Sequence, residues 1–242
     1  MHHEYDETAD LTRIMGGHEI WLGEARLNGD QAEMALIFGD NMRPDGSLDP
    51  KRINPTVYMP DGSTLKPAIS SEKDKHWLTF SCAGDGCYTA IVDLVPVIIT
   101  QDNEGYHIGP KYQFKNVTYS GAVVQMAKRI LSVGDAQPEL KEPIHGILEI
   151  VPRRLGFSQG EDAEIRVFYE GKPLAETEVK AISEKEGKLM AKTKTDNEGW
   201  AKIPLTVAGD WMFMVLHRDP TKKVSEEFDT TNFITTLVME AK

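Results

Sequence analysis

The stretch from Ala163 to Arg218 constrains the fold of this chain most, because its side chains alternate between apolar and polar. From Ala163 to Tyr169 the odd positions are apolar and two of the three residues between them are charged, a period typical of a strand with one buried face. Trp211 to Leu216 is apolar throughout, which predicts a strand buried on both faces. Glu-Gly-Lys-Pro at 170–173 and Asp-Asn-Glu-Gly at 196–199 are turn sequences. We therefore predict a β-sandwich here.

The upstream half shows the same kind of pattern. Gln31 to Phe38 alternates as a strand, and we expect His76–Ser81 to pair with Tyr88–Thr100 as a hairpin. At 242 residues the chain is long enough for two such units. The predicted fold class is all-β, with two β-sandwich domains in tandem. The predicted divisions are a mobile arm at 1–16, an N-terminal sandwich at 17–134, a linker at 135–145 and a C-terminal sandwich at 146–242.

Residues 121–133 fit two kinds of secondary structure. Apolar residues recur at the spacing of one helix face, while the β-branched content and the all-β setting favour a strand. The pattern alone leaves both alternatives open.

The two cysteines, Cys82 and Cys87, bracket the sequence Ala-Gly-Asp-Gly. A glycine-rich loop of this length would place them opposite each other across a hairpin, which favours a disulfide in an oxidising compartment. The rival hypothesis is a pair of thiolate metal ligands, but zinc sites usually show a second ligand pair and none is visible.

The charge balance limits the classes of partner. Asp and Glu number 38 against 27 Lys and Arg, a net charge of -11, so we expect no nucleic acid partner and consider cations better suited as ligands. The sequence contains no run of about 18 apolar residues, so we predict no transmembrane helix. The first residues lack the basic and apolar segments of a leader, so an exported protein would be represented here by its mature form, without the leader.

The sequence contains none of the common catalytic motifs. A nucleophile elbow, a P-loop, a zinc-protease helix and a dinucleotide-binding fingerprint are all missing. We therefore predict that the protein is not an enzyme.

The seven histidines are the best candidates for functional residues. Imidazole suits nickel and cobalt, with zinc and copper as alternatives. His3 would form a square-planar site with a free terminal amine if Met1 is the natural start; the alternative is a cloning remnant. His18 opens a predicted strand and His217 closes one, so each side chain can turn toward a cleft. For a single histidine, however, a hydrogen-bonded structural role is the commoner outcome.

Two resemblances add to these interpretations. The segments EGKPLAETEV, TDNEGWAKIPL and GDWMFMVLH, within residues 163–217, resemble transthyretin-like or carboxypeptidase-regulatory-like sandwiches, which carry no chemistry of their own. Nearly the whole chain from His18 resembles the secreted bacterial NikK-like family, found beside nickel and cobalt uptake systems. The segments that carry this second resemblance are HEIWL at 18–22, GDN at 39–41, GPK at 109–111, AK at 127–128 before VG at 133–134, and LEIVP at 148–152.

The NikK-like resemblance implies a function and a ligand set. It implies a periplasmic or otherwise extracytoplasmic accessory protein that binds nickel or cobalt and delivers it to the membrane component of an uptake transporter. The expected imidazole ligands are His18 and His217, with His3, His107 and Asp40 as further candidates, Asp40 standing where the family has a histidine.

The alternative hypothesis is a non-catalytic, adhesin-like sandwich that binds carbohydrate or protein through exposed aromatic residues. The candidate residues for that role are Trp21, Tyr106, Tyr112 and Trp200.

Overall fold

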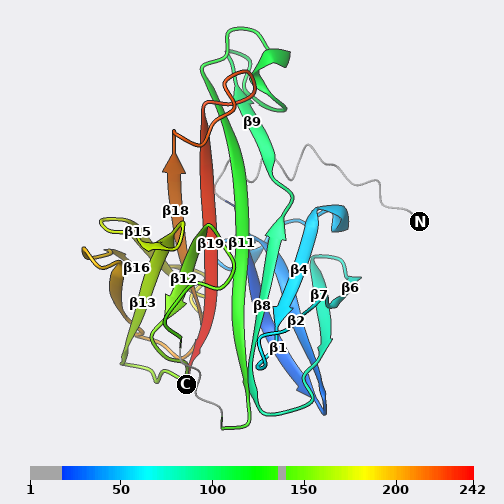
Figure 1. The fold of residues 1–242 in the computed structure, drawn as a ribbon, viewed down its shortest axis with the longest axis vertical. Helices are drawn as coiled ribbons and strands as arrows, with labels where there is room; N and C mark the ends of the chain where they lie inside the picture. Colours follow the sequence, from blue (N-terminus) through cyan, green and yellow to red (C-terminus); the bar gives the residue numbers. More distant parts are fainter. Residues whose placement is uncertain (1–17, 136–139) are drawn as a thin grey trace.

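The computed structural model describes residues 18–135 and 140–242, and nearly all of its regular structure is β-strand (Figure 1). The two 3-10 helices, η1 (Pro50–Arg52) and η2 (Lys111–Gln113), are the only helical elements among the described residues. The strands form three sheets, which we name A, B and C. The predicted all-β sandwich architecture is confirmed.

Sheet A is five-stranded and comes from the N-terminal half of the chain. Along its second strand, the predicted alternation places Met34, Leu36 and Phe38 in a buried core. The strands of sheet A are β1 (Glu19–Asn28), β2 (Gln31–Asp40), β3 (Arg43–Pro44), β6 (Ala68–Ser71) and β7 (Lys75–Ser81).

Sheet C is four-stranded and comes from the C-terminal half. Its central strand contains the predicted alternation, and Ala163, Ile165 and Val167 are fully buried. Gly199 has a φ of 80°, and a Cβ there would lie 2.8 Å from the Val167 carbonyl oxygen, so the predicted turn requires glycine. The strands of sheet C are β12 (Leu148–Pro152), β13 (Asp162–Tyr169), β14 (Lys172–Pro173) and β17 (Trp200–Pro204).

Sheet B is ten-stranded and continues through both halves of the chain. Its order is β16-β15-β18-β19-β11-β8-β4-β5, with β9 also paired to β11 and β10 paired to β9. Its strands are β4 (Ile53–Tyr58), β5 (Thr64–Leu65), β8 (Gly86–Leu94), β9 (Val97–Gln101), β10 (Tyr106–Ile108), β11 (Tyr119–Val133), β15 (Glu178–Ser183), β16 (Lys188–Lys194), β18 (Gly209–Asp219) and β19 (Thr230–Ala241).

Strand β11 resolves the ambiguity at residues 121–133. It is a 15-residue strand that pairs in parallel with β19 and antiparallel with β8 and β9. Odd positions such as Val123 and Ala127 enter one core, while Val124 packs on another. Because both faces are covered, apolar residues occur at odd and even positions, and their combined spacing imitates one face of a helix.

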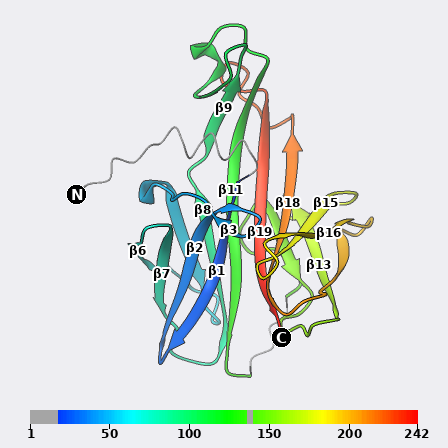
Figure 2. The ribbon, with the colours of Figure 1, turned by 180° about the vertical axis from the view of Figure 1, so that it is seen from behind.

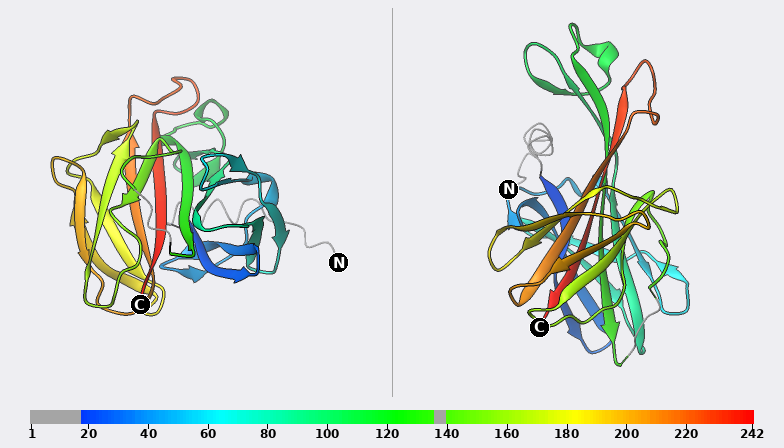
Figure 3. Two further views of the ribbon diagram at one scale, coloured as in Figure 1. Left: turned by 60° about the horizontal axis from the view of Figure 1, so that its bottom comes forward. Right: turned by 90° about the vertical axis from the view of Figure 1, so that its left-hand side faces the viewer.

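Sheets A and C cover opposite faces of sheet B, which we name the A face and the C face. Figure 2 shows sheet A and the strands of the C-terminal half on either side of β11 and β19, and the views in Figure 3 agree. The N-terminal core lies between sheets A and B, and the C-terminal core between sheets B and C. A third cluster joins the two halves. It lies on the face of sheet A that points away from the N-terminal core, and in it Trp21 and Trp77 cluster with Met212 and Met214 of β18. The N-terminal and C-terminal halves thus have separate cores, and sheet B runs through both halves.

The predicted hairpin at the cysteines is wrong, and the disulfide predicted from it is not present. β7 pairs with β2 and β6 in sheet A, whereas β8 pairs with β4 and β11 in sheet B. Cys82 therefore enters the N-terminal core, while Cys87 lies opposite Ser132 of β11, and both are free thiols. The connection between β7 and β8 joins two sheets that face each other.

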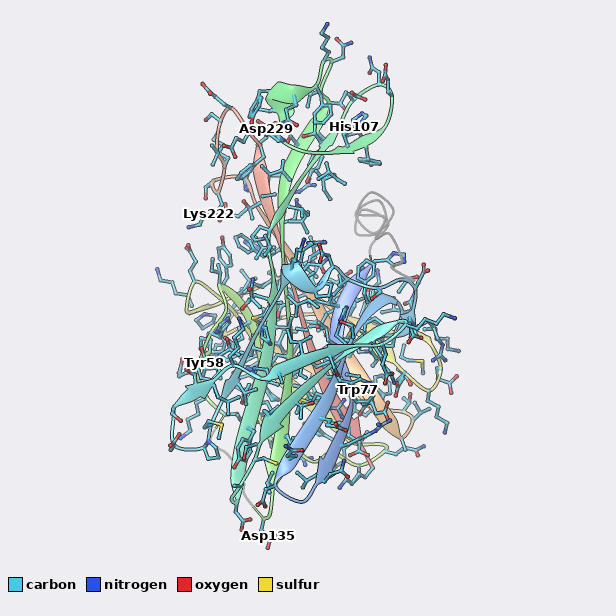
Figure 4. All side chains as sticks on the ribbon, turned by 90° about the vertical axis from the view of Figure 1, so that its right-hand side faces the viewer. Tyr58, Trp77, His107, Asp135, Lys222 and Asp229 are labelled. Carbon is cyan, nitrogen blue, oxygen red and sulfur yellow. The ribbon has the colours of Figure 1, made fainter. Side chains whose placement is uncertain are left out.

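One end of the molecule extends beyond sheets A and C, and we call it the tip (Figure 1). It contains β10, η2 and the loop 220–229, and Figure 4 shows His107, Lys222 and Asp229 there. The chain reaches it through a break at Val95 and Pro96, between β8 and β9, and β9 then continues along the upper part of β11. The Lys111 amide donates to the Glu227 carbonyl at 2.8 Å, which ties the two segments of the tip together.

Candidate functional site

His18, directly before β1, is the histidine whose surroundings best suit metal binding. His18 Nε2 lies 2.8 Å from Asp45 Oδ2, and the ring centroid of His18 is 5.4 Å from that of Phe38. The His18 carbonyl accepts a hydrogen bond from Gln125 Nε2 at 3.2 Å, which anchors this end of sheet A to the A face of sheet B. An ionised carboxylate only accepts, so a neutral His18 donates Nε2–H to Asp45 and keeps its lone pair on Nδ1.

Nδ1 of His18 is buried and forms no hydrogen bond with any residue that the structure describes. The side chain of His18 is 15% exposed, whereas that of Asp45 is 53% exposed. Buried polar atoms in folded proteins are nearly always paired. An unpaired ring nitrogen whose partner nitrogen is held by a carboxylate matches the arrangement of metal-ligating histidines.

A tight turn after β2 brings Asp45 to His18. A Cβ at Gly39 would lie 1.9 Å from the Arg43 carbonyl oxygen, so only glycine fits there. Asn41 and Met42 both have positive φ, 51° and 58°, which reverses the chain within a few residues. The Asp45 amide then donates to the Phe38 carbonyl at 3.0 Å and closes the turn.

Glu19 occupies the other side of the same strand end. It is 3% exposed and accepts a hydrogen bond from the Asn41 amide at 3.0 Å. Burial, with a smaller contribution from the charge of Asp40, raises the pKa of Glu19 to about 8. Because successive strand residues point to opposite faces, Glu19 and His18 diverge. Asp40 lies near Glu19 and accepts a hydrogen bond from Asn41 Nδ2 at 2.9 Å. The carboxylate that His18 contacts is that of Asp45.

The structure does not bring His217 and His18 together. His217 lies opposite Phe233 on the C face of sheet B, and its ring centroid is 4.3 Å from that of Tyr169 in sheet C. Tyr169 in turn donates to Asp219 at 2.5 Å. His18 is held on the A face, so sheet B separates the two imidazoles that we expected to converge.

His107 is also separate from His18. It lies at the tip, where Nε2 is 2.9 Å from Asp102 Oδ1 and the ring stacks on Phe114. His3 lies outside the described residues. Among residues 18–135 and 140–242, no three His, Cys, Asp or Glu side chains are grouped so that they could hold a metal ion.

A family match identifies the chain. The sequence model described as "Domain of unknown function (DUF4198)" matches residues 15–219. The chain belongs to the DUF4198 family. The matched residues include His18 and reach the end of β18, while β19 lies beyond them.

Comparisons with other proteins give this DUF4198 chain no finer identity. The search of curated proteins found no match. Among solved structures, the D0-D1 domain of intimin is 12% identical, with 92% of this chain and 96% of that chain covered and a TM-score of 0.24. An Escherichia coli alpha-2-macroglobulin segment spanning domains MG0-NIE-MG1 is 11% identical, with 93% and 97% covered and a TM-score of 0.24. A two-domain fibronectin type-III segment of chicken tenascin is 12% identical, with 89% and 97% covered and a TM-score of 0.19. TM-scores this low support no statement about the function of the DUF4198 chain.

Sequence patterns did not reveal two polar networks on the C face. Lys128, on β11, and Glu149, on β12, form an ion pair of 2.6 Å, with side chains 4% and 0% exposed. Glu149 also accepts from the amides of Ile144, His145 and Gly146. These bonds fix the segment that leads into β12. Alternation gives no indication that Lys128 pairs with Glu149, which lies 21 residues away in the sequence.

His145 forms the second network. Its Nε2 lies 2.6 Å from Asp93 Oδ2, and its Nδ1 lies 2.8 Å from the Tyr58 hydroxyl. The bond to Asp93 raises the pKa of His145. With both ring nitrogens engaged, His145 joins the segment before β12 to β4 and β8 as a structural residue.

Proposed function

We propose that this DUF4198 protein binds a divalent transition metal, nickel or cobalt, at the start of β1. In this proposal it is an extracytoplasmic accessory protein that delivers the metal to the membrane component of an uptake transporter. The resemblance of its segments to the NikK-like family and its net charge of -11 support the proposal. The described residues contain no helix that is long and apolar enough to span a bilayer.

The observation that carries the proposal is the state of the His18 ring. Asp45 accepts from Nε2, which fixes the tautomer and leaves Nδ1 with a lone pair and no hydrogen-bond partner among the described residues. Metal-binding histidines are commonly oriented by a carboxylate in this way, and imidazole nitrogen is a good donor for nickel and cobalt.

Among the described residues, no three His, Cys, Asp or Glu side chains are grouped so that they could complete a metal site with His18. His3, the further candidate from the sequence, lies outside the described residues. His217 and His107 lie elsewhere and serve as internal controls.

Calorimetric titration of the full-length, tag-free protein with nickel, cobalt and zinc tests this function. We expect binding tighter than about 10 μM. His18→Ala should abolish it, and Asp45→Asn should weaken it about 10-fold to 100-fold, whereas His217→Ala should match the unaltered protein. Absence of binding, or equal binding by His18→Ala, would overturn the proposal.

A second candidate function is recognition of carbohydrate or protein, and the exposure of two aromatic residues favours it. Tyr106 and Tyr112, at the tip, are 51% and 67% exposed, whereas Trp21 is fully buried in the third cluster. A glycan array probed with the unaltered protein and with Tyr112→Ala tests this function. Binding that Tyr112→Ala removes would support it, and an array without binding would count against its carbohydrate form.

A further inference from the structure

The upper part of the A face carries a pocket that sheet A does not cover. It has a volume of about 260 Å³ and lies between β9, β10, β11, β18 and β19. Val123 and Ile234 line it, and both also border the N-terminal core, so its floor is continuous with packed structure. Tyr106 and Leu216 also line it, and each is 51% exposed.

A fixed polar network forms one wall of this pocket. Arg218 Nε donates to Asn232 Oδ1 at 3.1 Å, and Asn232 Nδ2 donates to the Tyr119 hydroxyl at 2.7 Å. Asn232 is only 8% exposed, and its Nδ2 also lies 3.3 Å from the Ala122 carbonyl oxygen, which sets the orientation of the amide. A Cβ at Gly121 would lie 2.2 Å from the Tyr119 hydroxyl, so the network needs glycine beneath it.

The Arg218 guanidinium is held without a carboxylate. It lies 5.1 Å from the centroid of the Tyr119 ring and forms no ion pair with any residue in the described part of the chain. By contrast, Arg129, on the same face, bonds both carboxylate oxygens of Asp210, at 2.5 and 3.0 Å. A guanidinium presents donors in a planar fork that matches a carboxylate, and here its terminal nitrogens remain available at the pocket.

We propose that this pocket binds a small organic acid. The carboxylate would pair with Arg218, and an apolar or aromatic body would lie against Val123, Leu216 and Tyr106. The volume is slightly below the range of about 300–1,000 Å³ that is common for drug-sized ligands, which suits a small molecule rather than a peptide segment. This inference is independent of metal binding, because none of the lining residues is a proposed metal ligand.

The test is a ligand-observed NMR titration of the full chain with EDTA present. The probes are benzoate, phenylacetate and 4-methylpentanoate, each compared with its neutral amide. We expect the acids to bind with Kd on the order of 0.1–1 mM and the amides at least about tenfold more weakly.

Arginine variants locate the site. Arg218→Gln should weaken acid binding about tenfold or more, and Arg218→Lys should fall between it and the unaltered protein because lysine lacks the fork. Arg166→Gln is the matched control, since Arg166 also stacks on an aromatic ring and donates through Nε to a backbone carbonyl. Equal binding of acids and amides, no binding of any acid, or an unchanged Kd in Arg218→Gln would overturn the inference.

Discussion

At the first residue of β1, the Glu19 carboxylate is buried with backbone amides as its closest partners. Burial and Asp40 raise its pKa to about 8, which means that folding favours its protonated form. An acid whose folded pKa exceeds its unfolded value loses stability as pH rises between the two values. For Glu19 this interval runs from the ordinary glutamate pKa of 4.5 to about 8.

Glu19→Gln is therefore expected to stabilise the protein at alkaline pH. The amide oxygen keeps the hydrogen bond from Asn41 but does not ionise. Urea denaturation should give equal stability for the two proteins near pH 4 and a gain of roughly 1–4 kcal/mol for the variant near pH 8.5. Glu198→Gln, on an exposed turn, is the control and should change stability by less than about 0.5 kcal/mol at both pH values. A difference independent of pH would contradict this account.

The buried pair of Lys128 and Glu149 leads to a second prediction for single residues. Burial lowers the pKa of Lys128, so its charge depends on Glu149. Lys128→Met should destabilise by about 3–5 kcal/mol, and Glu149→Ala by more, because three backbone amides also lose their acceptor.

Urea denaturation of both single variants and the double variant measures this coupling. Lys192→Met is the control, since Lys192 and Glu178 are each 49% exposed, and should cost less than about 1 kcal/mol. A cost below about 1 kcal/mol for Lys128→Met would contradict the buried pair.

Among single residues, the sequence could indicate His18 but not its partner. Asp45 lies 27 residues away in a polar, turn-rich segment, and no periodic pattern singles it out. His18 directly precedes β1, as expected, whereas His217, which we expected to close a strand, lies two residues before the end of β18. Their separation depends on which face of sheet B each one meets, and that follows from tertiary pairing.

For elements, strands with one covered face were the easiest to predict. β2 and β13 alternate clearly because one face of each lies in a core. β11 was ambiguous because both of its faces are covered. The pairing of β7 and β8 was mispredicted because a short glycine-rich loop can join two facing sheets as well as two neighbouring strands.

Cys82 directly follows β7 of sheet A, whereas Cys87 lies in β8 of sheet B, so we expect the two thiols to remain unpaired and to differ in reactivity. Burial raises the pKa of both thiols. The intact mass of the unreduced protein should correspond to two free thiols. Cys87 should react with a maleimide before Cys82, which is 2% exposed and should react only in urea. Cys87→Ser identifies the faster site, and a disulfide mass in the folded protein would contradict this arrangement.

For the whole molecule, the pairing of β11 with β19 joins the two halves. The third cluster adds apolar packing between them, so neither half retains its full burial alone. We predict one cooperative thermal transition, with the calorimetric and van't Hoff enthalpies equal. The isolated fragment 18–135 should lack the dispersed NMR spectrum of a folded domain. Two resolved transitions, or a folded fragment, would contradict this prediction.

Anomalous scattering at the nickel edge tests the central claim, metal binding through His18, most directly. Crystals of the tag-free protein grown with nickel should show a peak within about 2.0–2.2 Å of His18 Nδ1, with Nε2 still bonded to Asp45. Absence of a peak at His18, or a peak at His217 or His107 alone, would contradict the proposed site.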